Sequence, residues 1–464
     1  MKTYAKHVGL AALLLFALLL FFMPGAQAQE PAGTACAPDA ETLEAYRADG
    51  TLAERQAYYE SLSLNQTDPG LIAQAQAQES GSASLRAVPS GWKTGMATTG
   101  DANILLIRVD FPDYRFSGND TEDALRQIAF GPAGGGQPGY PYESLSAYYE
   151  RSSYGQLHIS GQAASYTAAN NRDTYSRNMA GLFKEAMTAL DAQGMDFSQF
   201  DGNGDGLMDG VYIHFAGPDT GWGSPWWSQK AHYEGAPFVL DGVALSDYVT
   251  LHDNSANGAR TLIHETGHML GLADYYSYTA QTYENGIRTF DMMCDNTGDH
   301  NGFSKWLLGW INPEDITRVS AADGSAALTL SAISGNDGSK IAVVSPTDSG
   351  MFSEYFLIQY DVPGLNNEGI YYPDVPDSGF RVFHINAALN ADGSNFMYMN
   401  KTPAEPKLIE AVARKARRLP ICRCSIQRAC VWRRTPPRTA AFSAASTRPT
   451  RAWYWRTWTP KMPA

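Results

Sequence analysis

Residues Thr261–Tyr276 read TLIHETGHMLGLADYY, and they include the pattern His-Glu-x-x-His. Positions four apart lie on the same face of a helix, so His264 and His268 can direct both imidazoles at one metal ion. Glu265 then lies beside the open coordination position, where it can take a proton from water. The spacing therefore predicts a zinc site of the zincin type.

The same stretch continues as Gly-x-x-Asp and suggests a third ligand. Gly271 can adopt a positive φ and end the helix in a sharp turn, which would return Asp274 towards the metal. Spacing leaves other side chains open for this role. They lie in the following segment and are Glu284, Asp291, Asp295 and His300.

A five-residue HExxH pattern alone also occurs by chance in amphipathic helices with solvated histidines. Two features extend the match here. Apolar residues flank the pattern, as a buried helix requires, namely Leu262, Ile263, Met269, Leu270 and Leu272. Phe290–Met293 reads FDMM, and a Met at this distance resembles the Met-turn beneath the metal in metzincins. For the Met pair taken alone, ordinary core packing is the alternative.

The N-terminus has the features of a signal peptide, which we expect to span residues 1–28. Lys2 and Lys6 precede an uncharged apolar run, Leu10–Met23, and Ala26-Gln27-Ala28 fits a cleavage site before Gln29. The run is short for a membrane span. We therefore expect a secreted, extracellular protein with no stable membrane span after cleavage.

Residues 29–95 are polar, with a helical pattern over Ala40–Leu62, and are expected to be a pro-segment or N-terminal arm. A simple linker is the alternative. Cys36 in this region could cap the zinc as a thiolate, pair with Cys294, or stay reduced. The other three of the five cysteines lie beyond residue 420, so the body of the chain is not a disulfide scaffold.

Charge divides the chain into two parts. Of its 35 Lys and Arg residues, 13 lie in 414–464, where there is no Asp or Glu, so residues 1–413 hold 22 basic and 48 acidic residues. The acidic body argues against nucleic acid as a partner. We interpret 414–464 as an aberrant basic tail that follows a lost reading frame. A genuine tail that binds anionic surfaces is the alternative.

The hydrophobic pattern predicts an α+β protein of two domains. Residues 96–318 form the catalytic domain, with a mixed twisted sheet that begins with the apolar run Ala102–Phe111, buried on both faces. Residues 319–413 contain alternating strands separated by Gly, Asn, Asp and Pro. They predict a small β-rich domain, which the loss of reading frame near Arg414 would truncate.

A second motif with chemical character is Asp201–Asp209, DGNGDGLMD. Oxygen ligands at positions 1, 3, 5, 7 and 9 of a calcium loop would come from Asp201, Asn203, Asp205, the Leu207 carbonyl and Asp209. Position 12 is tyrosine and a strand follows, so the motif is not an EF-hand. We favour a structural calcium ion over the alternative, a turn rich in Asp and Asn.

The aromatic segment Gly221–Lys230 leads towards the predicted metal site. It could form a cleft rim or an edge strand that receives an extended peptide. A sugar-stacking platform built on Trp222, Trp226 and Trp227 and plain core packing are the alternatives.

Six segments taken together resemble the immune inhibitor A family of secreted bacterial metallopeptidases, over roughly residues 100–390. They are VDF at 109–111, YYERSSYGQLHISG at 148–161, FDGNGDGLMDG at 200–210, HETGHMLGLADYY at 264–276, FDMM at 290–293 and KWLLGWINP at 305–313. The resemblance implies a metzincin-like catalytic domain, one catalytic zinc, structural calcium and export as a zymogen.

The resemblance also implies roles for individual residues. His264, His268 and Asp274 would be zinc ligands, Glu265 the general base and Met293 the Met-turn residue. The expected function is a zinc endopeptidase that hydrolyses protein or peptide substrates. The alternatives are a non-catalytic, metal-stabilised surface adhesin or binding module, and a zinc enzyme that acts on glycoproteins.

Overall fold

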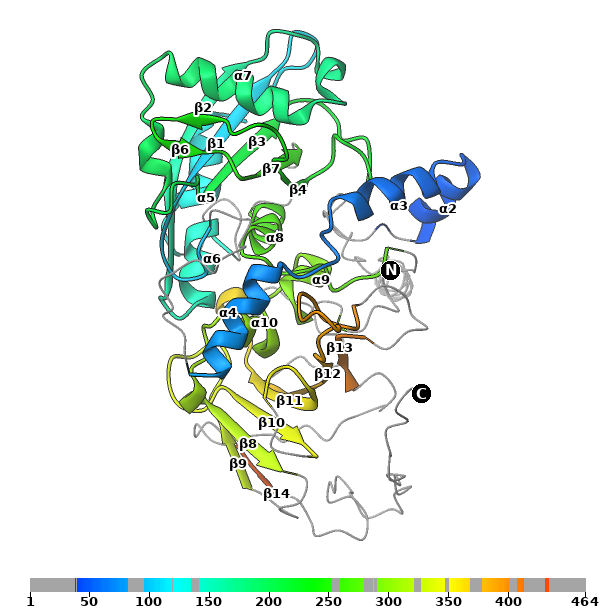
Figure 1. Ribbon diagram of the computed structural model, residues 1–464, viewed down its shortest axis with the longest axis vertical. Helices are drawn as coiled ribbons and strands as arrows, with labels where there is room; N and C mark the ends of the chain where they lie inside the picture. The colour runs from blue at the N-terminus through cyan, green and yellow to red at the C-terminus, as the bar shows by residue number, and fades with distance from the viewer. Residues whose placement is uncertain are drawn as a thin grey trace, which may run out of the picture. The chain divides into compact units, whose positions relative to one another are not determined.

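The computed structural model describes residues 38, 40–81, 96–118, 120–134, 142–252, 259–278, 287, 290–320, 327–346, 350–367, 378–399, 407–412 and 430–433. The described residues all belong to one compact unit (Figure 1). The predicted signal peptide and Cys36 lie outside the described residues.

The described part of the chain is mixed α/β, which agrees with the α+β class expected from sequence. Its α-helices are α2 Ala40–Ala48, α3 Leu52–Ser61, α4 Pro69–Glu79, α5 Glu122–Phe130, α6 Leu145–Ser152, α7 Met179–Asp191, α8 Arg260–Met269, α9 Met292–Asp295 and α10 Gly302–Leu307. The strands of the first large sheet are β1 Gly100–Asp110, β2 Leu157–Thr167, β3 Gly210–Phe215, β4 Gln229–His232 and β7 Asp247–His252. A short hairpin joins β5 Val239–Leu240 to β6 Val243–Ala244.

The first sheet has the strand order β2-β1-β3-β7-β4. Its first four strands are parallel, and β4 pairs antiparallel with β7 at the edge. This sheet is therefore mixed, as the sequence predicts.

Strand β1 lies inside this sheet, between β2 and β3, and is buried on both faces. Ile104 and Leu106 belong to the hydrophobic cluster that also holds residues of α8, whereas Leu105 and Ile107 belong to the cluster with α7. Successive side chains of a strand point to opposite faces, so an unbroken apolar run suits a strand covered on both sides. Figure 1 shows α7 and α8 on these two faces.

The second large sheet has the strand order β13-β12-β11-β10-β8. Its strands are β8 Ile316–Ser320, β10 Ile341–Ser345, β11 Glu354–Asp361, β12 Gly379–Asn386 and β13 Ile409–Ala411. Strand β8 pairs with β10, so this sheet begins just before the expected boundary at residue 319. Leu357 and Phe383 share one core cluster with Phe303 of α10, so hydrophobic packing is continuous from the first sheet to the second.

Part of the N-terminal region forms three helices, and the sequence analysis missed α4. Its signals were present: Asp68 accepts a hydrogen bond from the N–H of Gly70 as the N-cap, and Pro69 is the first helical residue. Leu71 and Ile72 are fully buried. This region therefore packs on the body of the protein over residues 40–81.

The tail beyond residue 413 is described only at Cys430–Arg433, strand β14, which pairs with β9 Ala327–Leu330. The predicted loss of frame stays a prediction.

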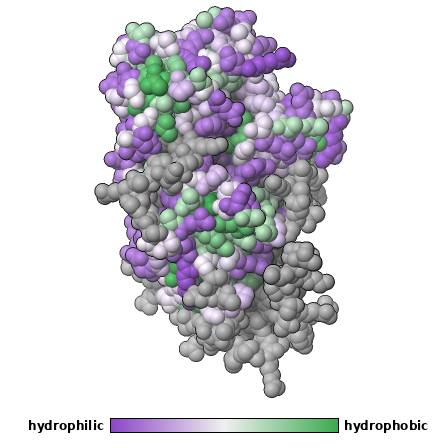
Figure 2. Space-filling model, viewed as in Figure 1, coloured by the Kyte–Doolittle hydropathy of each residue, from purple (hydrophilic) through white to green (hydrophobic). Residues whose placement is uncertain are grey.

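No helix in the described ranges is both long and apolar enough to cross a membrane. In the view of Figure 2, hydrophilic residues cover much of the visible described surface, and hydrophobic residues lie in small groups.

Candidate metal centre

Helix α8 carries the HExxH pattern through the protein interior. Every residue from Thr261 to Met269 is buried. Gly271 follows at φ +95°, the left-handed conformation expected after the helix. A Cβ at this position would lie 3.0 Å from the Cβ of Asp68 and 3.1 Å from that of Leu71, so the close approach of the arm also favours glycine.

The two histidines of α8 are held by hydrogen bonds to main-chain carbonyls. The Nδ1 of His264 lies 3.0 Å from the carbonyl oxygen of Met292, and the Nδ1 of His268 lies 2.8 Å from that of Leu272. A carbonyl oxygen only accepts, so each Nδ1 carries the proton and, in the neutral ring, each Nε2 keeps its lone pair. This is the orientation in which histidine binds a metal through Nε2.

The carboxylate of Asp274 faces the Nε2 atoms of both histidines. Its Oδ1 lies 3.2 Å from the Nε2 of His264 and 3.4 Å from the Nε2 of His268, and none of these three atoms has a hydrogen bond of proper geometry. The ligand atoms all lie within 4.8 Å of one another, and all three residues are buried. Two imidazole nitrogens and one carboxylate oxygen that converge in this way form a donor set that fits a zinc ion.

Burial and the neighbouring charges act in opposite directions on the pKa values of His264 and Asp274. Burial disfavours a charged imidazole, but the Asp274 carboxylate outweighs burial and raises the pKa of His264 to about 9. Burial likewise acts to raise the pKa of Asp274, but the two histidines hold that pKa at about 2. The site therefore attracts positive charge from within a fully buried environment.

Glu265 lies at the start of the same turn and is fully buried. Neither of its carboxylate oxygens makes a hydrogen bond of proper geometry, and the main-chain N–H of Lys230 lies near them. Burial raises the pKa of Glu265, against the opposing effects of the two histidines and the main-chain N–H of Lys230. An unpaired buried carboxylate with a raised pKa is suited to accept and release a proton.

The other candidates for the third ligand have different partners. The carboxylate of Asp291 accepts hydrogen bonds from the N–H of Met293 and Asn301, each at 2.8 Å, and His300 faces this carboxylate at 3.4 Å. Asp295 is not part of the converging group, and Glu284 lies outside the described residues. Within the described ranges, Asp274 alone joins the two histidines.

Met293 lies against α8 between the two histidines. A Cβ on Gly267 would come within 2.3 Å of the Met293 sulfur, so glycine at this position lets the Met side chain contact the helix directly. The N–H of Tyr275 also donates to the carbonyl of Met293 at 2.9 Å. The Met segment thus supports both the helix and the turn that carries Asp274.

The N-terminal arm, which we define as residues 40–81, contacts this turn. The N–H of Asp274 donates to the carbonyl of Leu64 at 2.8 Å, and the N–H of Asp68 donates to the carbonyl of Gly271 at 2.9 Å. Tyr58 of the arm accepts a hydrogen bond from Gln229, the first residue of β4. The arm therefore touches both the metal turn and the edge strand.

Two partners of Asp274 were not predicted from the sequence. Tyr278 donates its hydroxyl hydrogen to the Oδ2 of Asp274 at 2.8 Å, and Leu64 fixes the main chain. Tyr278 lies four residues after Asp274 in an aromatic run, and this spacing could have predicted the contact. Nothing in the local sequence of Leu64 indicates its contact.

The three tryptophans expected near the site are buried at 1–7% exposure. Trp222 packs on Tyr59 and Tyr278, Trp226 on Phe111 and Phe215, and Trp227 on His252. They pack in the interior, so no exposed ring surface is available on them for sugar stacking. The edge strand β4 includes only the end of the aromatic segment.

The predicted calcium loop has the hydrogen bonds of an Asp-rich turn. Asp201 accepts from the N–H groups of Gly204 and Gly206, and the Oδ2 of Asp209 accepts from those of Gly202 and Asn103. Asp209 is fully buried with its Oδ1 unpaired, and burial raises its pKa to about 7. Within the described chain, the loop carboxylates do not converge as the zinc candidates do.

No protein-family model matches this chain, and no curated protein matches it.

Proposed function

We propose that the protein is a secreted zinc-dependent endopeptidase. The observation that supports this function best is the convergence of two histidine lone pairs and one carboxylate oxygen on a buried point, beside the unpaired carboxylate of Glu265. Residues His264, His268 and Asp274 would hold the zinc ion. We also propose that the domain around α8 is metzincin-like, with Met293 as the Met-turn residue.

The chain's own residues would perform the proton transfers. Bound zinc would supply Lewis acidity that polarises the scissile carbonyl and lowers the pKa of a water molecule towards ~7. Glu265 takes the proton of the attacking water and passes it to the leaving amine. Its raised pKa suits both steps, because the carboxylate accepts the proton readily and the acid still releases it.

Strand β4 supports the binding of an extended peptide. The N–H of Tyr233 bonds to the carbonyl of Ser246, and paired residues of an antiparallel ladder alternate between bonded and non-bonded positions. The main-chain groups of Lys230 and His232 therefore point to the open edge, away from β7. A substrate strand can pair with them there, next to Glu265.

The N-terminal arm supports a latent form. It contacts the metal turn through Leu64 and Asp68, and the edge strand through Tyr58. We propose that this arm is a pro-segment whose release opens the site to substrate.

The test combines metal analysis with proteolysis. We expect the protein recovered from the culture medium to contain one zinc per chain and to cleave casein, and a chelator to abolish cleavage. Glu265→Gln should keep its zinc and lose at least about 1000-fold of the activity, since the base is removed. Unchanged casein turnover in this variant would remove Glu265 from the mechanism.

The adhesin alternative predicts a different result in the same experiment. A protein that keeps its zinc but cleaves neither casein nor glycosylated substrates would be a metal-stabilised binding module. A preference for glycosylated over bare substrates would favour the glycoprotein enzyme.

We also propose that calcium binds at Asp201–Asp209. Calcium would offset the cost of ionising the buried Asp209 and would use its unpaired Oδ1. Millimolar calcium should raise the melting temperature of the wild type, and Asp205→Ala should remove most of that increase. Equal melting temperatures of the wild type with calcium and with a calcium chelator would reject this site.

A further inference from the structure

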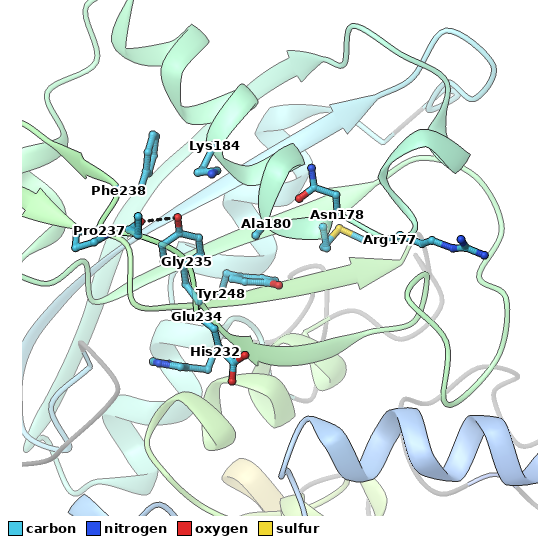
Figure 3. Close-up of a pocket in the computed structure, with 13 residues that line it drawn as sticks. Arg177, Asn178, Ala180, Lys184, His232, Glu234, Gly235, Pro237, Phe238 and Tyr248 are labelled. Atoms are coloured by element: carbon cyan, nitrogen blue, oxygen red, sulfur yellow. Dashed lines mark hydrogen bonds between the residues drawn. The ribbon is translucent and has the colours of Figure 1, made fainter.

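A cavity of about 590 Å³ lies at the end of strand β4 (Figure 3). It is open to the surface and is lined by the beginning of α7, by the loop that follows β4 and by Tyr248. Tyr233 and Tyr248 belong to the core cluster packed on α7, so the cavity opens on the face of the sheet opposite α8. None of its lining residues takes part in the metal centre.

The cavity is basic within an acidic chain. Two basic residues, Arg177 and Lys184, line it against one carboxylate among the lining residues, Glu234, whereas the whole chain has a net charge of −13. Figure 3 shows Lys184 and Asn178 on the α7 side and Tyr248 across the cavity. The lining thus combines aromatic surface with cationic groups, which suits an acidic side chain.

The nearest buried acid does not oppose this charge. Asp247 is fully buried and pairs with Lys230 at 2.7 Å and with the Nδ1 of His232 at 2.5 Å. Its negative charge is therefore compensated, and the pairing fixes the His232 ring. Lys184 lies over the ring of Tyr233 and has no ion pair with a described residue.

The cavity lies along the path of a substrate bound to β4. The main chain of Lys230 approaches Glu265, and His232 and the cavity follow in the C-terminal direction of the strand. A substrate strand antiparallel to β4 runs towards its own N-terminus in that direction. At about 3.4 Å per residue, the cavity lies about two to four residues before the scissile bond. Alternate side chains of such a strand point to the α7 face.

We propose that this cavity is a specificity subsite that binds an Asp or Glu side chain on the N-terminal side of the scissile bond. This inference rests on the proposed endopeptidase function. Lys184 supplies a charge-assisted hydrogen bond to the substrate carboxylate, and the tyrosines pack on its methylene groups. The Arg177 side chain extends away from the other lining side chains (Figure 3) and adds positive charge at the edge of the cavity.

The test uses pairs of fluorogenic peptides that differ only by Glu or Gln at the second, third or fourth position before the cleaved bond. We expect the protein recovered from culture medium to prefer the Glu peptide at one of these positions by about tenfold in kcat/KM, chiefly through KM. Lys184→Glu should lose or reverse the preference. Arg126→Glu, on the exposed part of α5, is the matched charge control and should change nothing.

A binding measurement separates this inference from the proposed function. Glu265→Gln protein should bind the Glu peptide about tenfold more tightly than the Gln peptide in fluorescence polarisation. Equal binding or equal cleavage of the two peptides, in protein that still hydrolyses casein, would overturn the subsite and leave the endopeptidase intact. Absence of all hydrolysis, with the binding preference retained, would overturn the endopeptidase instead.

Discussion

The N–H of Asp274 donates a hydrogen bond to the carbonyl oxygen of Leu64 at 2.8 Å, across more than 200 residues of chain. This contact joins the candidate third ligand to the N-terminal arm. Asp68 makes a second main-chain contact in the same place, with Gly271 at 2.9 Å. The main chain of the arm is therefore hydrogen-bonded to the turn that follows α8. Displacement of the arm would break both of these hydrogen bonds.

Loosening the arm should activate the full-length protein. Leu71 is fully buried, so Leu71→Ala should weaken arm packing by about 2–5 kcal/mol. We expect faster removal of the arm by trypsin and higher casein turnover before any processing. Gln76→Ala, at an exposed position of the same helix, is the control. Lower turnover in Leu71→Ala would mean that the arm supports the site and does not cover it.

The choice of third ligand can be tested by metal affinity. Asp274→Ala removes the oxygen that faces both histidines, so zinc affinity should fall at least about 100-fold. His300→Ala removes a ring that pairs with Asp291, so zinc affinity should change little. Competition with a chromophoric chelator measures both constants. The reverse ranking would assign the metal to His300.

Gly267 and Met293 should be energetically coupled. Gly267→Ala places a methyl group within 2.3 Å of the Met293 sulfur, which should cost about 1–3 kcal/mol of unfolding free energy. Adding Met293→Ala makes room for the methyl group, and Ala favours the helix by about 1 kcal/mol. A double-mutant cycle in urea measures the coupling. Strict additivity of the two changes would contradict direct packing.

The half-buried His214 should make the fold sensitive to acid. Burial, with the nearby charges of His252 and Arg108, lowers the pKa of His214 to about 4. The unfolded chain takes up this proton near 6.5, so the stability conferred by neutral His214 is complete above that pH and is lost as pH falls towards 4. His214→Asn should reduce the loss of unfolding free energy between pH 7 and pH 5 by about 1–2 kcal/mol.

The exposed His158 provides the control for this pH effect. His158→Asn makes the same substitution at a position where the ring and its partner Glu150 are both about half exposed. A wild-type pH profile that coincides with that of His214→Asn would show that His214 remains solvated in the folded protein.

Local sequence patterns were sufficient for several elements because their causes are local. The run from Ala102 to Phe111 predicted a doubly buried strand, and β1 spans Gly100–Asp110 with its side chains in two core clusters. The four-residue spacing of His264 and His268 predicted neighbouring rings, whose centroids lie 4.9 Å apart. The left-handed Gly271 was likewise predicted from the end of the pattern.

Other features depended on segments that are distant in sequence. Spacing left Asp274, Asp291 and His300 open as third ligands, and they separate only because Asp291 is used by the main chain of the α10 turn. The tryptophans had three possible roles until Tyr59 and Phe111 packed on them. Tertiary contacts of this kind have no local signature.

The sequence by itself determined the helix, the two histidines and the glutamate between them, because helical geometry fixes positions one turn apart. Only the tertiary structure decided which carboxylate faces the two histidines. It also decided that the arm binds the turn that carries this carboxylate. These depend on packing between chain segments up to 200 residues apart, where side-chain shape and hydrogen bonding, and not spacing, select the partner.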